Sequence, residues 1–241
     1  MALPSKDQKE RYVRDMFNGI AHRYDIMNTF MTFGRDQSWR KYAVQRARIQ
    51  AGMQVLDVCC GTAALSIEIA RSVGMEGLVT GLDFSEKMLE IGAQNVKQAH
   101  MDARIQLLQG NAMNLPFADA SFDAVTVGWG LRNVPDIELA LWEMYRVVKP
   151  GGWVVSLDMA KPTAPVFKQA YWLYFDWLVP MLGKVTAGKK SAYQYLHDSS
   201  KAFDSQQQLT ERFRKTGFLH AAYHNLMGGV VAVVEGQKPQ Q

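Results

Sequence analysis

Short apolar runs alternate with amphipathic segments along the middle of this chain, and this alternation constrains the fold more than any other feature. The apolar runs cover residues 54–59, 78–84, 104–110, 122–130 and 152–159. The segments between them carry apolar residues at helical spacing. Strands that alternate with helices in this way are typical of a parallel sheet with helices on both faces. The alternation therefore predicts an α/β fold, whose ligands bind outside the carboxyl ends of the strands.

The segment before the fifth run shows the expected helix most clearly. Its predicted buried face consists of four residues at helical spacing, Leu139, Trp142, Met144 and Val147. The Lys-Pro-Gly-Gly sequence at 149–152 is expected to end this helix and to turn the chain into the next strand.

The remaining segments are expected to complete one domain, residues 1–241, around this core. Two late runs at 218–226 and 230–236 surround a Met-Gly-Gly turn. They predict a hairpin that closes one edge of the sheet with an antiparallel strand. We divide the domain into an N-terminal helical cover, a cofactor-binding core, a helical substrate cover and closing strands, at 1–50, 51–160, 161–216 and 217–236.

Charge and hydropathy exclude several classes of protein. The formal net charge of +4 is too mild for a nucleic-acid partner, which calls for a clustered basic face, although it would tolerate an anionic membrane surface. The N-terminal stretch lacks the apolar core of a signal peptide. No run of about 18 uncharged apolar residues occurs, so no segment is expected to span a bilayer. We therefore expect a cytoplasmic protein, and we leave a homodimer open.

The two adjacent cysteines, Cys59 and Cys60, suggest a metal or redox site at first sight. Zinc needs about four ligands at recognisable spacing, and the five histidines of the chain offer none. A redox pair needs a spacer and an exposed thiolate. We interpret both cysteines as small apolar residues at a strand end and predict no metal site.

Polar or small residues at the ends of successive strands predict a cofactor site. Gly61 follows the first strand, where a helix begins and the backbone can approach a ligand closely. Asp83 ends the second strand, where a carboxylate can accept hydrogen bonds from both ribose hydroxyls. Asn111 and Ala112 follow the third strand, where an amide and a backbone N–H can bind an adenine edge. Gly128, in the fourth run, completes the predicted set.

The glycine content of the first loop helps to choose the cofactor. A pyrophosphate needs a glycine-rich loop, whereas this loop has one glycine, Gly61, and can accommodate an amino-acid carboxylate. Asp57 offers a negative group for an ammonium. S-adenosylmethionine, which carries both groups and an adenosine, therefore fits better than NAD. A nicotinamide-dependent oxidoreductase and a non-catalytic quinone- or lipid-binding protein stay open as alternatives.

Longer motifs carry a resemblance to a known family. They are "MFNGIAHRYDIMN", "VLDVCCGTA", "GLDFSEKML", "GNAMNLPFADASFD", "GWGLRNVPD", "MYRVVKPGG" and "YQYLHDSS". Over about residues 13–236 the chain resembles the C-methyltransferases of ubiquinone and menaquinone biosynthesis. The resemblance implies a class I S-adenosylmethionine-dependent methyltransferase fold, with a seven-stranded, mostly parallel twisted sheet, an antiparallel last strand and a helical cover. It also places Thr62, Asp83, Asn111 and Ala112 at the cofactor contacts.

Details of the motifs favour one branch of this family. Ala63 stands where many members have glycine, and this form resembles the menaquinone branch more than the ubiquinone branch. The resemblance therefore implies methylation of a prenylated demethylmenaquinol to menaquinol, with a polyprenyl benzoquinol as the alternative acceptor. The chain departs from the family pattern at the end of the fifth run, where Asp158 takes the place of a glutamate, and in "KAFDSQQQL", which lacks a frequent proline.

The same resemblance assigns candidate residues to the chemistry. Arg132 and Asn133, after the fourth strand, are predicted catalytic residues. Arg132 would stabilise a phenolate or orient a water that takes its proton; the alternative is an arginine that pairs with a structural acid. Tyr24 and Asp25 are expected to close over cofactor and acceptor from the N-terminal cover. Candidates on the substrate side are Tyr195 and Ser199.

Two further features complete the expectations. His22 and His197 are interpreted as surface or capping residues, despite a side-chain pKa suited to a base. The aromatic stretch 166–182 is either a covering helix or an apolar wall for a prenyl tail. Flanking lysines would then support peripheral contact with the inner face of the cell membrane; these are Lys168, Lys184, Lys189 and Lys190.

Overall fold

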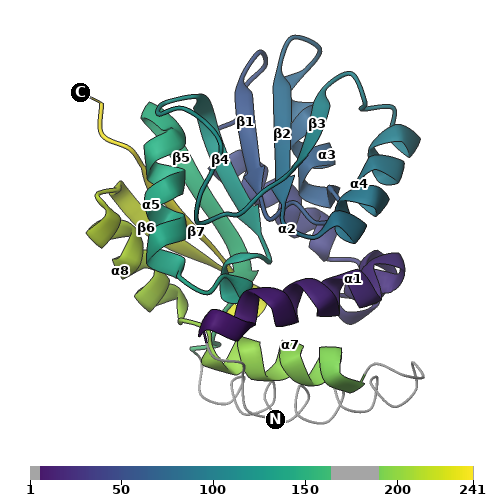
Figure 1. The fold of residues 1–241 in the computed structure, drawn as a ribbon. Helices are drawn as coiled ribbons and strands as arrows, with labels where there is room; N and C mark the ends of the chain where they lie inside the picture. The colour runs from purple at the N-terminus through teal and green to yellow at the C-terminus, as the bar shows by residue number, and fades with distance from the viewer. Residues whose placement is uncertain (1–5, 164–189, 241) are drawn as a thin grey trace.

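In this computed structural model, residues 6–163 and 190–240 are described, and they form one seven-stranded sheet (Figure 1). The strand order is β3-β2-β1-β4-β5-β7-β6. The strands are β1 Gln54–Val58, β2 Leu78–Asp83, β3 Ile105–Gln109, β4 Phe122–Gly128, β5 Val148–Met159, β6 Leu219–Leu226 and β7 Val231–Gln237. The first five strands pair in parallel, while β7 runs antiparallel to both β5 and β6. The predicted sheet and its closing hairpin are confirmed.

Helices surround the sheet and cross one end of it. They are α1 Lys6–Met31, α2 Asp36–Arg46, α3 Ala64–Val73, α4 Glu86–Gln98, α5 Ile137–Val147, α7 Lys190–Ala202 and α8 Gln206–Thr216, with short turns η1 Leu131–Asn133 and η2 Met227–Gly229. Local signals set where several of them begin. Ser85 caps α4, Asp136 caps α5, and Ser205 forms a capping box with Gln208 at α8.

Alternating side chains on the strands build a hydrophobic core on each face of the sheet. On β1, Leu56 and Val58 pack into a cluster with α5 and α8. Val55, which points to the opposite face, packs into a cluster with α2, α3 and the end of α4. The sheet therefore has helices on both faces, as the sequence predicts.

The buried face of α5 differs from the expected one. Met144 and Val147 are buried, but Leu139 and Trp142 leave 47% and 58% of their surface exposed. The core-facing positions also include Ala140 and Leu141. The helix carries apolar residues around more than one face, so its periodicity alone did not identify the buried side.

The Lys-Pro-Gly-Gly sequence at 149–152 does not separate helix from strand as predicted. Strand β5 begins at Val148, directly after α5, and includes these four residues. Pairing with β4 shifts register between Phe122 and Ala124, where Gly151 adopts a φ of +79°. Positive φ at glycine is the usual way in which a chain makes such an irregularity within a strand.

Helix α1 passes below the carboxyl ends of the parallel strands in Figure 1, and α7 lies beneath it. It contacts α4 and η1, which follow β2 and β4. In the described part of the chain, no helix is long and apolar enough to cross a membrane. The stretch 166–182 and its lysines at 168, 184 and 189 lie outside the described residues, so the expected wall for a prenyl tail stays a prediction there.

Candidate active site

Three cavities adjoin one another between the strand ends and α1, and each predicted site residue lines at least one of them. The cofactor pocket, of about 680 Å³, is lined by Gly61, Asp83, Asn111, Ala112 and Gly128, among others. The acceptor pocket, of about 430 Å³, is lined by Arg132, Asn133, Tyr195 and Ser199 together with apolar side chains. The loop pocket, of about 370 Å³, is lined by Asp25, Asp57 and Thr62. Tyr24 lines all three, and Asn133 lines the first two.

Asp83 joins the loops that follow β1 and β2. Its Oδ2 accepts a hydrogen bond from the Gly61 backbone N–H at 2.9 Å, and its Oδ1 accepts one from the Ser85 backbone N–H at 2.9 Å. Gly61 adopts a φ of +55°, and an added Cβ there would lie 3.2 Å from the Met88 side chain. Burial raises the pKa of Asp83 to about 6, against the effect of these amide donors. A carboxylate has about four acceptor sites, so lone pairs remain for two ribose hydroxyls.

Asp57 lies fully buried at the base of the loop pocket. It accepts hydrogen bonds from the Ser66 hydroxyl at 2.6 Å and the Thr126 hydroxyl at 2.8 Å. Burial raises the pKa of Asp57 to about 6, partly offset by the two hydroxyl donors, and the nearby Asp83 raises it further. The charge of Arg40, which also lines this pocket but pairs with Asp36, lowers the pKa of Asp57 somewhat. No cation among the described residues hydrogen-bonds to Asp57, so the desolvated carboxylate can attract an ammonium group.

Asp25 anchors α1 to the predicted cofactor loop. Its Oδ1 accepts a hydrogen bond from the Thr62 hydroxyl at 2.7 Å, and its Oδ2 accepts one from the Asn95 amide at 3.1 Å. The Asn95 amide also donates to the Thr62 carbonyl at 3.0 Å. Asp25 lines the loop pocket but not the acceptor pocket. These contacts favour a positioning role over the catalytic role expected from the sequence.

Two other α1 side chains hold the helix over the strand ends, and sequence reasoning missed both. Lys9 donates to the carbonyl oxygens of Arg132 and Val134 at 3.0 and 2.9 Å. Asn18 accepts a hydrogen bond from the Ser85 hydroxyl at 2.7 Å. Both belong to a charged helix in which polar residues are common, so nothing in their spacing distinguishes them.

Arg132 is buried against Asp158 at the edge of the acceptor pocket. One terminal nitrogen donates to Asp158 Oδ1 at 2.6 Å and to the Trp129 carbonyl at 2.8 Å. Burial lowers the pKa of Arg132, but the charge and hydrogen bond of Asp158, together with Tyr24 and Tyr195, more than offset this effect, and the net shift is upward. The guanidinium therefore stays charged. The acid that the family pattern places at the end of the fifth strand is thus the partner of the predicted catalytic arginine.

Unpaired polar atoms gather beside this arginine. Among the described residues, Arg132 Nε, Asn133 Oδ1 and the Tyr195 hydroxyl are buried without a hydrogen-bond partner. All three residues line the acceptor pocket, whose other walls are largely apolar. Buried polar groups in proteins nearly always have a partner. An aromatic ring with polar oxygens is a ligand that would satisfy them.

Both tyrosines of the pocket are neutral donors at physiological pH. Burial raises the pKa of Tyr24, against the effect of the Arg132 charge. Burial raises the pKa of Tyr195 to about 12, again against Arg132. Neither phenol is thus suited to act as a base, although each can donate a hydrogen bond.

Cys59 lines the cofactor and loop pockets and Cys60 lines the loop pocket, whereas no described histidine lines any of the three cavities. Burial, and then the nearby Asp83 and Asp57, hold the pKa values of Cys59 and Cys60 well above their usual range. Both are therefore thiols, as our interpretation of them as packing residues requires. His22 is exposed and His197 contacts Asp198. The described residues contain no cluster of three or more His, Cys, Asp or Glu that could hold a metal ion.

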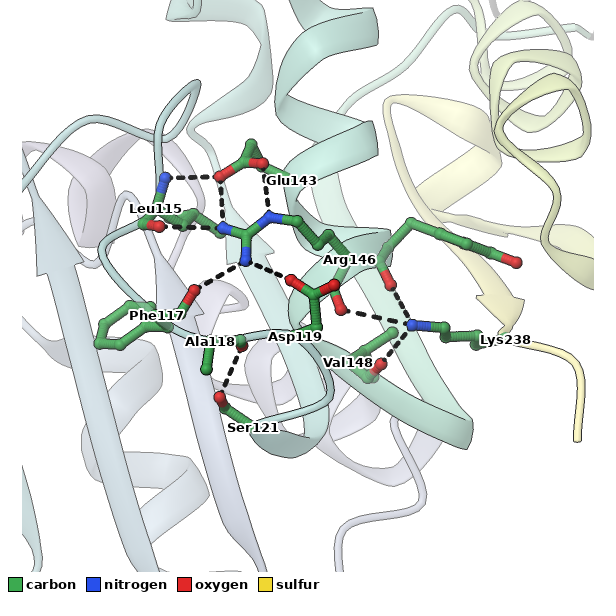
Figure 2. A network of polar contacts seen from close by, with 10 residues as sticks. Leu115, Phe117, Ala118, Asp119, Ser121, Glu143, Arg146, Val148 and Lys238 are labelled. Carbon is green, nitrogen blue, oxygen red and sulfur yellow. Dashed lines mark hydrogen bonds and ion pairs between the residues drawn. The ribbon is translucent and has the colours of Figure 1, made fainter. Parts of the chain in front are cut away.

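The loop after β3 is fixed to α5 by a polar network (Figure 2). Arg146 donates to the carbonyl oxygens of Leu115 and Phe117 at 3.0 and 2.7 Å, and to Asp119 at 2.9 Å. Glu143 accepts from the Leu115 backbone N–H at 2.7 Å and from Arg146. This network holds the loop that presents Asn111 and Ala112 to the cofactor pocket.

Within that loop, the side-chain oxygen of Asn111 already accepts a hydrogen bond from the backbone. Its Oδ1 accepts a hydrogen bond from the Met113 backbone N–H at 2.9 Å. The amide nitrogen of Asn111 consequently remains available as a donor, and the adenine contact expected from the sequence stays a prediction.

The chain is similar to known proteins in sequence and in fold. A model of the ubiE/COQ5 methyltransferase family matches residues 5–238. A demethylmenaquinone methyltransferase of Desulfitobacterium hafniense is 59% identical over 100% of this chain and 94% of its own length. One of Staphylococcus haemolyticus is 44% identical over 98% of each chain. The structure of an S-adenosylmethionine-dependent methyltransferase from Thermotoga maritima shares the fold, with a TM-score of 0.65 and 20% identity over 93% of this chain and 99% of that one.

The match of the family model over nearly the whole chain, and the identity to full-length relatives, agree with the motifs that follow β1, β2, β3 and β4. The chain belongs to the ubiE/COQ5 methyltransferase family.

Proposed function

We propose that this protein is an S-adenosylmethionine-dependent methyltransferase that converts a prenylated demethylmenaquinol to menaquinol. The observation that carries the proposal is the acceptor pocket, where three unpaired buried polar atoms lie among apolar walls beside the cofactor pocket. Relatives that carry the name demethylmenaquinone methyltransferase support the choice of acceptor.

The residues of the cofactor and loop pockets fit S-adenosylmethionine. Asp83 keeps acceptor sites for the ribose hydroxyls, and the Asn111 amide can donate to the adenine. The backbone near Gly61 and Thr62 would receive the amino-acid carboxylate at the beginning of α3. Asp57 would attract the ammonium. When bound, S-adenosylmethionine supplies an electrophilic methyl group.

The residues of the acceptor pocket would orient and activate the ring. The charged guanidinium of Arg132 would stabilise the phenolate, which makes the adjacent ring carbon nucleophilic. Tyr24 and Tyr195 would hold the quinol by donating hydrogen bonds, and the apolar walls would exclude water. Holding the reactants in one geometry supplies much of the remaining acceleration. In this proposal residues 51–160 would bind the cofactor, while 1–50 and 161–216 would cover the acceptor side.

Methyl transfer to two acceptors side by side tests this function. S-adenosylmethionine labelled in its methyl group would be supplied with a short-tailed demethylmenaquinol or with the benzoquinol precursor of ubiquinone. We expect label in the naphthoquinol and little in the benzoquinol. A strong preference for the benzoquinol would contradict the proposed acceptor, and no transfer to either would contradict the reaction. Calorimetric titration with NADH serves as the control, because an oxidoreductase would bind it.

The proposed acceptor also implies contact with a lipid phase. The apolar side chains of the acceptor pocket offer space for the start of a prenyl tail, and the rest of such a tail is a membrane lipid. We therefore propose that the protein works in peripheral contact with the membrane.

A further inference from the structure

Three large apolar side chains are exposed at the C-terminal end of α1. Ile26, Phe30 and Phe33 leave 74%, 63% and 72% of their surface exposed. Ile26 and Phe30 are four residues apart and share one helix face, while Phe33 follows in the turn after the helix. Clustered exposed apolar side chains of this kind mark interaction surfaces, whereas single ones are ordinary. We call these three side chains the α1 patch.

Basic residues near the α1 patch are exposed, whereas the acidic ones are buried or engaged in contacts. Arg23 and Arg35 are exposed. Asp25 is engaged with the cofactor loop, and Asp36 is 2% exposed. These two are the only acidic residues between positions 16 and 38. The segment that carries the patch therefore presents positive charge outward and keeps its carboxylates inside.

A neighbouring face of the same helix forms a wall of the acceptor pocket. Met27 and Met31 line that pocket, and each directly follows a residue of the patch in the sequence, Ile26 or Phe30. Successive residues of a helix point about 100° apart. One helix thus separates the acceptor pocket from the α1 patch.

We propose that the α1 patch, with Arg23 and Arg35, docks on an anionic lipid bilayer and places the acceptor pocket at the membrane surface. Apolar side chains that enter the headgroup region next to basic ones are the features of a peripheral membrane contact. Basic residues near such a surface add attraction to anionic lipids, which salt screens. The choice of a bilayer over a protein partner rests on the proposed function, because a prenylated quinol resides in lipid.

Co-sedimentation with vesicles tests the docking surface directly. The variant carries Phe30→Gln and Phe33→Asn; glutamine suits a helix, and asparagine tolerates the φ of +53° at position 33. The matched control carries Leu139→Gln and Trp142→Gln, which replace two exposed apolar side chains on α5. Vesicles of phosphatidylcholine are used with and without phosphatidylglycerol, at low and high salt.

We expect the native protein and the α5 control to bind the phosphatidylglycerol vesicles at low salt and to be released by high salt. The α1 variant should bind about ten-fold more weakly. A second variant, Arg23→Gln with Arg35→Gln, should lose the salt-sensitive part of binding. Three results would overturn the proposal: no binding of the native protein, equal binding of the α1 variant, or an equal loss in the α5 control.

Activity measurements separate this proposal from the proposed function. With a short-tailed acceptor in solution, the α1 variant should turn over like the native protein, which also shows that it folds. With a long-tailed acceptor in vesicles, its turnover should fall about ten-fold. Equal turnover on the vesicles would contradict docking. If the native protein fails on the short-tailed acceptor, the proposed function fails, whereas sedimentation still decides the membrane contact.

Discussion

Arg132 lies between a buried carboxylate and the acceptor pocket, and different nitrogens of its guanidinium are available to each. One terminal nitrogen pairs with Asp158, while Nε has no partner among the described residues. The sequence left two interpretations open, a phenolate-stabilising arginine and an arginine that pairs with a structural acid. The geometry accommodates both, because Asp158 fixes the guanidinium while Nε remains for a ligand.

Replacing Arg132 should therefore lower turnover far more than cofactor affinity. In Arg132→Lys the ion pair with Asp158 can persist but the planar donor is lost, so we expect turnover to fall about 10- to 100-fold. The turnover of Arg132→Ala should fall further. Its free energy of unfolding should drop by about 3–5 kcal/mol, because Asp158 is left buried and unpaired. The dissociation constant of S-adenosylhomocysteine should stay within about two-fold in Arg132→Lys, since Arg132 does not line the cofactor pocket.

Steady-state kinetics and calorimetry on both variants provide the measurement. Lys41→Ala, at an exposed position on α2, serves as the control for loss of a surface cation. A folded Arg132→Ala protein with native turnover would reject the role of this residue in the reaction.

The loop that follows β3 is held in position by side chains of α5. Glu143 accepts a hydrogen bond from the backbone N–H of Leu115, and Arg146 donates to the backbone carbonyl oxygens of Leu115 and Phe117 (Figure 2). The side chain of Arg146 is absent from the walls of the cofactor pocket. We infer that it is a positioning residue, which would act on a bound adenine through the loop that carries Asn111.

Arg146→Lys should weaken the binding of the adenine group. Lysine cannot reach this set of acceptors with one nitrogen, and lost hydrogen bonds of this kind cost about 1–3 kcal/mol. We expect S-adenosylhomocysteine to bind about ten-fold more weakly, with turnover at saturating cofactor near the native value. The preference for S-adenosylhomocysteine over S-inosylhomocysteine should shrink as well.

Competitive titrations with the two nucleosides distinguish positioning from general destabilisation. Arg214→Lys, on α8, provides the matched control because Arg214 binds Glu211 and a β6 carbonyl instead. An equal loss of affinity for both nucleosides would show that Arg146 only stabilises the fold, and unchanged affinities would reject its role.

For the whole molecule, the sequence predicted the elements that leave periodic patterns and missed the features that depend on contacts between distant segments. The alternating runs predicted the sheet, because buried strands and amphipathic helices leave periodic patterns. Asp83 and Asn111 were found because they end strands, and strand ends meet at one edge. The resemblance strengthened the choice of Arg132, which its position after the fourth strand already suggested, and that of Tyr24 in the N-terminal cover.

Contacts between distant segments explain the parts that were missed. Lys9 and Asn18 bind loops after β4 and β2, but each is one polar residue in a long helix rich in them. Leu139 and Trp142 were assigned to the core because their spacing is helical, yet the side that α5 buries is decided by the sheet and α8. The exposed end of α1 likewise became visible only when a neighbouring face of that helix was seen to wall the acceptor pocket.

The central claim is that a quinol ring in the acceptor pocket is methylated on carbon, and the product itself tests this most directly. S-adenosylmethionine carrying a ¹³C methyl group would be incubated with the protein and a short-tailed demethylmenaquinol, and the extracted product examined by ¹³C NMR. We predict one labelled resonance, that of a methyl group bonded to the quinone ring, together with S-adenosylhomocysteine. A labelled methoxy resonance, or label confined to unreacted cofactor, would contradict the account.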